Sequence, residues 1–200
     1  MRSRSVVLFA VAAATAAFAV PSQAAATGST TLFFANEGGP GTGGCSPVYV
    51  LDKAATGNPC SSIQAGYAGN GSLGDDTFSS VKSAVGFTLD ASKPLTGVVN
   101  IATYPIVSGT PVNTLPGMAA ADIEISVNGT VVGTVSGSGQ AVAPNSVVTI
   151  PVSLKLPAKL NKAKVKSVDV HVTYTTATGI TGVDYSADNG SKLVFSTFKK

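Results

Sequence analysis

The sequence predicts an all-β fold, organised as a single β-sandwich of eight or nine short strands. Three observations support this: apolar and polar residues alternate along several segments, turn residues separate these segments, and no segment has a convincing helical pattern. Charged residues make up only 12% of the chain, and Gly, Ser, Thr, Val and Ala are abundant, which argues against a disordered chain. Two topologies stay open, a jelly roll and a Greek key of the immunoglobulin type.

The clearest local pattern is a hairpin in the middle of the chain. Ile123, Ile125 and Val127 alternate with polar residues, Asn128-Gly129 follows, and a second strand-like run covers residues 130–135. Asn-Gly between two such runs favours a type I′ turn, because both central residues of that turn need a positive φ. The pattern therefore predicts two antiparallel strands joined at Asn128.

Other segments have a similar composition. Pro151 cannot donate a ladder hydrogen bond, so it predicts an edge position or a bulge in its strand. Long Gly- and Pro-containing loops are expected over 36–47 and 105–120. The remaining expected strands cover 31–35, 48–51, 78–89, 95–104, 147–156, 165–174 and 193–198.

The N-terminal 24 residues have the pattern of a cleaved signal peptide. Arg2 and Arg4 form a basic start, an uncharged apolar run of about 15 residues follows, and Ala24 ends a small-residue cleavage site. The run is shorter than the roughly 20 residues of a membrane-spanning helix, so no membrane span is expected in the mature form. An uncleaved anchor is the alternative. We expect a secreted, extracellular protein with a flexible leader at 25–30 and one domain at 31–200.

Cleavage would change the charge balance of the chain. Both arginines lie in the signal segment, so 13 basic residues fall to 11 lysines against 10 acids, a net charge of about +1. Nucleic-acid binding draws on clustered Lys and Arg, so a near-neutral chain without arginine argues against a nucleic-acid partner.

Cys45 and Cys60 are the only cysteines. An even number of cysteines in an exported chain favours a disulfide. The bridge would close a loop of about 16 residues, worth roughly 3 kcal/mol in the chain-entropy description.

The sequence offers little that predicts catalysis. The glycines at 39–44 fit G-x-G-x-x-G, but no helix is expected after them, so no dinucleotide cofactor is predicted. His171 lies in an expected strand beside Asp169, on the solvent side, with no nucleophile implied. No catalytic residue is assigned. A hydrolase acting through paired carboxylates is the enzyme alternative.

Acidic residues in two expected loops are the candidates for a metal site. Carboxylates in loops can bind Ca²⁺, although neither loop matches a defined calcium motif, and solvated turns are the alternative interpretation. The residues are Asp75, Asp76, Asp184 and Asp188.

Two other groups of residues could contact a ligand. Tyr67 and Tyr185 fall in expected loops, where an exposed ring can contact a glycan. Five lysines in a segment of twelve residues could meet an anionic surface, or could keep a turn soluble and protect a strand edge. They are Lys155, Lys159, Lys162, Lys164 and Lys166.

Residues Leu89–Gly97 and Leu156–Val172 resemble strand-and-turn segments of accessory β-sandwich domains in secreted actinobacterial proteins. The resemblance implies a secreted, non-catalytic module and carries no activity with it. The sequence thus predicts a binding or structural module that acts at the cell envelope, on an extracellular polymer or on a protein partner. The alternatives are a self-associating surface or fibre subunit and the carboxylate hydrolase.

Overall fold

A computed structural model describes twelve segments of the chain. They are residues 27–36, 40–41, 44–45, 48–54, 66–67, 74–104, 106–107, 110–111, 116–142, 147–177, 179–184 and 190–199. The signal segment, Cys60, Tyr185 and Asp188 lie outside these residues, so the predictions made for them stay predictions.

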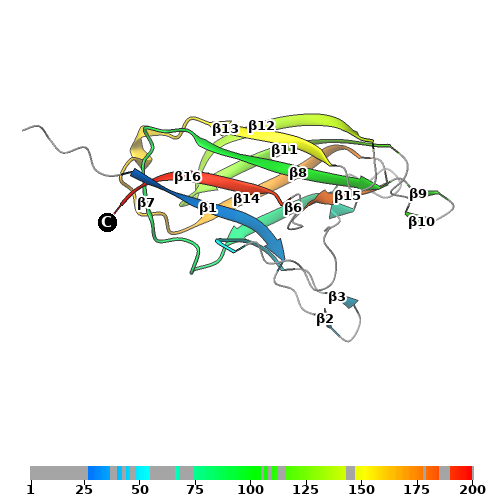
Figure 1. Cartoon of the computed structure of the whole chain (residues 1–200), viewed down its shortest axis with the longest axis horizontal. Helices are drawn as coiled ribbons and strands as arrows, with labels where there is room; N and C mark the ends of the chain where they lie inside the picture. Colours follow the sequence, from blue (N-terminus) through cyan, green and yellow to red (C-terminus); the bar gives the residue numbers. More distant parts are fainter. Residues whose placement is uncertain are drawn as a thin grey trace, which may run out of the picture.

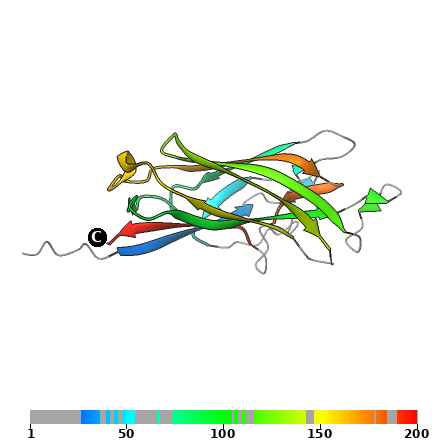
Figure 2. The same cartoon turned by 90° about the horizontal axis from the view of Figure 1, so that it is seen from above.

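The fold is nearly all β and consists mainly of one curled sheet (Figures 1 and 2). Its strands follow the order β12-β11-β14-β6-β4-β1-β16-β8-β15-β5, with β13 paired to β8 and β7 to β16. These strands are β1 (Thr27–Asn36), β4 (Tyr49–Asp52), β5 (Gly66–Tyr67), β6 (Asp75–Ser80), β7 (Thr88–Leu89), β8 (Leu95–Tyr104), β11 (Gly117–Val127), β12 (Thr130–Ala141), β13 (Val148–Leu154), β14 (Val168–Ala177), β15 (Ile180–Val183) and β16 (Lys192–Phe198).

Two small separate ladders lie outside the sheet. They are formed by β2 (Pro40–Gly41) with β3 (Gly44–Cys45) and by β9 (Ile106–Val107) with β10 (Thr110–Pro111). A single 3₁₀ turn, η1 (Ala158–Leu160), is the only helical element in the described segments.

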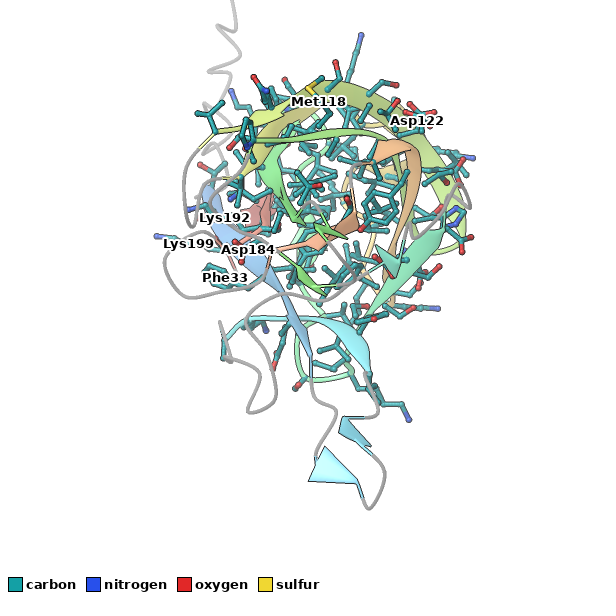
Figure 3. All side chains as sticks on the ribbon, turned by 90° about the vertical axis from the view of Figure 1, so that its right-hand side faces the viewer. Phe33, Met118, Asp122, Asp184, Lys192 and Lys199 are labelled. Atoms are coloured by element: carbon teal, nitrogen blue, oxygen red, sulfur yellow. The ribbon has the colours of Figure 1, made fainter. Side chains whose placement is uncertain are left out.

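The core fills the inside of the curl because inward residues alternate with outward ones along each long strand. Ile123 and Ile125 of β11 and Val170 of β14 are fully buried. Phe34 and Phe78 meet edge to face, with ring centroids 4.8 Å apart. Figure 3, which looks into one end of the molecule, shows the interior of the curl occupied by side chains.

Two strands from opposite parts of the sheet order, β12 and β13, come together through glycines. Ile150 and Val148 of β13 lie against Gly137 and Gly139 of β12, and a Cβ at Gly137 would be 2.7 Å from Cγ1 of Ile150. The missing side chains therefore let β12 approach β13 closely, although no ladder joins the two strands in the described residues.

Several sequence predictions are confirmed. The strand expected at 95–104 is β8, with the same bounds. Asn128 and Gly129 join β11 to β12 with φ values of 51° and 71°, as the Asn-Gly turn predicts. Pro151 lies in β13, which pairs with β8 alone in the described sheet and is therefore an edge strand.

Other expectations about the elements are wrong. The loop expected at 105–120 ends earlier, because β11 begins at Gly117. The strand expected at 78–89 is interrupted by a turn, in which Ala84 N donates to Val81 O at 3.0 Å. Residues 27–30, expected in a flexible leader, belong to β1 and pair with β16, where Thr27 lies opposite Phe198.

Candidate anion-binding site at the lysine-rich end

The end of the sheet that carries the C-terminus lies on the left of Figure 1. Strand pairing brings seven exposed lysines to this end. Five of them come from the segment that the sequence singled out, and two come from elsewhere in the chain. We call this group the lysine end: Lys93, Lys155, Lys159, Lys162, Lys164, Lys166 and Lys199.

Backbone pairing between residues 86–89 and 162–165 brings Lys93 to the predicted lysine segment. Leu89 accepts a hydrogen bond from Lys162 N at 2.8 Å and donates one to Ala163 O at 2.9 Å. The side chain of Asn161 adds a further contact, since its Oδ1 accepts from Ala91 N at 3.1 Å. Lys93 follows two residues later, so it lies beside this pairing.

The seventh lysine, Lys199, follows the last strand, β16. Thr88 pairs with Phe198 on one side and forms an isolated bridge with Lys164 on the other. Lys199 comes directly after Phe198, and its Cγ lies 3.5 Å from the position of a Cβ at Gly28. The first and last strands of the domain thus both reach the lysine end.

The side chain of Asn128 fixes the lysine segment in place. Its Oδ1 accepts hydrogen bonds from Lys166 N at 2.6 Å and Ser167 N at 3.2 Å, and its Nδ2 donates to Lys164 O at 3.0 Å. Sequence reasoning assigned Asn128 a turn and missed this second role, which depends on a contact 36 to 39 residues away. Leu160 and Val165 of the same segment are buried in the core, which also holds the segment in place.

The lysine end carries little compensating charge. None of its seven lysines forms a salt bridge with a residue in the described segments. Asp90 is a carboxylate within the same region, but it is buried and accepts hydrogen bonds from Ser92 N at 3.1 Å and Ser92 Oγ at 2.6 Å. The ammonium groups are therefore available to bind an external anion. A single contact of this kind is weak, and several contacts made at once give a substantial attraction.

His171 and Asp169 both occupy the outward positions of β14, as expected, but each side chain bonds to a partner on β6. His171 Nε2 lies 2.8 Å from Asp75 Oδ2, and Asp169 accepts a hydrogen bond from Ser79 Oγ at 2.8 Å. Asp75 and Asp76 open strand β6 and do not lie in a loop, contrary to prediction. Both side chains of the His171–Asp75 pair are substantially exposed, so the pair contributes little stability.

Asp76 points to the opposite side of β6 and is buried. Tyr174 donates a 2.6 Å hydrogen bond from its hydroxyl to Asp76 Oδ2. Burial raises the pKa of Asp76 above 3.8, as does the nearby Asp75 charge, while the Tyr174 hydrogen bond and His171 act in the other direction. Burial, with the Asp76 charge and hydrogen bond, raises the pKa of Tyr174 well above 10.0. The pair is a polar contact within the core.

Asp76→Asn should remove a pH-dependent loss of stability. Because the pKa of Asp76 is higher in the folded protein than in the unfolded chain, its ionisation lowers stability as the pH rises from about 3.8 through the folded value. Asparagine keeps an oxygen that can accept from Tyr174. We expect urea unfolding to show the variant gaining stability relative to the parent from pH 4 to pH 7. A stability difference that does not change with pH would contradict this account.

The other candidate residues do not come together into a site. Tyr67 lies in β5, opposite Ile180 of β15. Asp184 is buried beyond β15, and its backbone N donates to Asn100 O at 2.8 Å. Within the described residues, no three His, Cys, Asp or Glu side chains are placed to hold one metal ion. Cys45 lies in β3 opposite Pro40, and its disulfide with Cys60 remains a prediction.

A shallow, open depression of about 330 Å³ lies on the outer side of β11 and β12. Asp122 lines it and accepts a 2.5 Å hydrogen bond from Ser136 Oγ. Figure 3 shows Asp122 on the outside of the curled sheet.

No helix in the described part of the chain is long and apolar enough to cross a membrane. No family model matches the chain, and no curated protein has significant sequence similarity to it. Any functional proposal therefore depends on the geometry and charge of the molecule.

Proposed function

We propose that this protein is a secreted, non-catalytic β-sandwich module that binds an anionic polymer of the cell envelope through its lysine end. The observation that carries the proposal is the gathering of seven exposed lysines without a salt-bridge partner among the described residues. The predicted export signal supports an extracellular setting. The approach of β12 to β13 supports a sandwich, because it brings the two ends of the curl together.

The geometry supports a polymer as the ligand in preference to a small anion. Each exposed lysine contributes roughly 1 kcal/mol or less to an ionic contact, so useful affinity requires several contacts at once. A linear polyanion can meet several lysines simultaneously, and the fixed backbone at Asn128 reduces the entropy lost on binding. Lysine acts as a point charge without the fork geometry of arginine, so charge density should matter more than the shape of the anionic group.

Replacing Lys155, Lys159, Lys164 and Lys166 together by glutamine should abolish most polymer binding. The salt dependence of binding should also decrease, because fewer counterions are released when four lysine contacts are lost. Four such contacts weaken the affinity for the polymer roughly 50-fold between about 50 and 200 mM salt. The measurement is co-sedimentation of the exported, oxidised protein with washed cell envelopes and with an insoluble anionic polysaccharide, at several salt concentrations.

Two matched controls make this test specific. The same four positions changed to arginine keep the charge and should keep binding, and Lys192→Gln removes a lysine from β16, outside the lysine end. Retention that survives both high salt and the glutamine variant would overturn the proposal. In that case binding to neutral polysaccharide would be tested next, with Tyr67 as the first position to change.

A further inference from the structure

The face formed by β12, β11, β14 and β6 carries no basic residue other than His171. These four neighbouring strands contain neither lysine nor arginine. Their outward positions, which alternate with buried ones, hold mainly hydroxyl side chains and four carboxylates, together with Met118, Val131 and Gln140. We call this surface the lysine-free face; its carboxylates are Asp75, Asp122, Glu124 and Asp169.

Strand register places these carboxylates close together. Asp122 and Asp75 both lie opposite Thr173, one on each side of β14. Glu124 lies opposite His171 in the next row. Since neighbouring strands are about 4.8 Å apart, Asp122 and Asp75 are separated by roughly 10 Å at the backbone. His171 is already bonded to Asp75, so it neutralises at most one of the four charges.

The two signs of charge are thus separated on a molecule whose mature net charge is about +1. A surface of this kind attracts a cationic partner, and the cationic surface that the structure itself supplies is the lysine end. We propose that the lysine end of one copy of the protein binds the lysine-free face of a second copy. The complementary charges steer the two copies together and disfavour face-to-face or end-to-end contacts.

The proposed contact joins two different surfaces, so it is heterologous. A copy bound through its lysine end still offers its lysine-free face to another copy, which permits chains of copies to grow where the geometry does not close a ring. The described carboxylates are exposed or half-exposed, so the attraction is screened by salt, with a Debye length of about 10 Å at 0.1 M. The inference does not depend on polymer binding, although a polyanion would compete for the same lysines.

Paired charge reversal tests this contact. The first variant carries Lys155→Glu, Lys159→Glu, Lys162→Glu, Lys164→Glu and Lys166→Glu, so two lysines and five glutamates remain at the lysine end. The second carries Asp122→Lys, Glu124→Lys and Asp169→Lys, so one carboxylate and three lysines remain on the face. In the first variant both surfaces are negative, and in the second both are positive, so neither should self-associate. Mixed together, they should associate again, because each lysine-end surface then meets a face of opposite sign. Sedimentation velocity at about 20 mM salt measures the size of the parent, of each variant and of the mixture.

We expect the parent to grow in size with concentration at low salt and to return to a monomer at about 500 mM salt. Lys192→Glu, outside the lysine end, should behave like the parent, and circular dichroism would confirm that all variants are folded. Failure of the mixture to associate would overturn the contact, as would self-association of either variant at the parent level. If the protein is retained on the polymer but does not self-associate, the proposed function stands and this inference is rejected. If it self-associates but is not retained on the polymer, this inference stands and the proposed function is rejected.

Discussion

Gly97→Ala should lower the free energy of unfolding by more than about 3 kcal/mol. A Cβ at this position would overlap the carbonyl oxygen of Lys192 and lie 3.0 Å from Cα of Leu193. Both obstacles involve the backbone of β16, which cannot rotate away as a side chain would. Gly97 also pairs with Val152 of β13, so movement of β8 to the other side would break a second ladder.

Urea unfolding measures this effect. Gly28→Ala is the matched control, because its nearest neighbour would be Thr197 Oγ1 at 3.4 Å, an ordinary contact. We expect the control to stay within about 0.5 kcal/mol of the parent. A Gly97→Ala variant with the stability of the control would show that β8 and β16 do not pack as closely as described.

Asn128→Ala should destabilise the protein by roughly 4 kcal/mol. The substitution removes three side-chain hydrogen bonds, each worth about 1 kcal/mol, and places alanine at a φ of 51°, where a Cβ is unfavourable. Asn128→Gly tolerates that φ and loses only the hydrogen bonds, so it should lie between alanine and the parent. Urea unfolding separates the two contributions.

The same pair of variants tests whether the lysine segment is held in place. Hydrogen exchange at Lys166 N and Ser167 N should become faster in both, because Asn128 Oδ1 no longer accepts from them. Polymer binding should weaken as well, although every lysine is still present. Unchanged exchange at these two amides would mean that the segment keeps its conformation without Asn128.

Local sequence patterns predicted where the long strands lie because each strand has one buried side, although β11 and β12 extend beyond the expected runs of 123–127 and 130–135. The alternation at Ile123, Ile125 and Val127 and the Asn128-Gly129 turn determine a hairpin without any information from distant residues. The start of β11 was not predicted because it depends on a contact with a distant residue. Gly117 was interpreted as a loop residue, whereas its missing side chain makes room for Thr103, whose Cγ2 would lie 2.7 Å from a Cβ there.

The candidate site was only partly predictable because tertiary pairing assembles it. Five of its lysines lie within twelve residues of the sequence, and this local concentration predicted a basic patch. Lys93 joins them because Leu89 and Ala91 bond to residues 161–163. Lys199 joins them through Thr88, which pairs with both Phe198 and Lys164. Asp76 shows the same limit, since its partner Tyr174 lies 98 residues away and nothing in the local Asp-Asp pattern points to a buried strand position.

The pairing of β1 with β16 has a practical consequence for anyone who handles this protein. Thr27 lies opposite Phe198 at the lysine end, so an affinity tag or fluorescent fusion joined next to Thr27 or Lys199 would be tethered beside the ammonium groups. Such a tag would cover the surface under test and reduce its apparent affinity for polyanions. A label attached near β9 and β10, at the opposite end of the molecule in Figure 1, would leave that surface open.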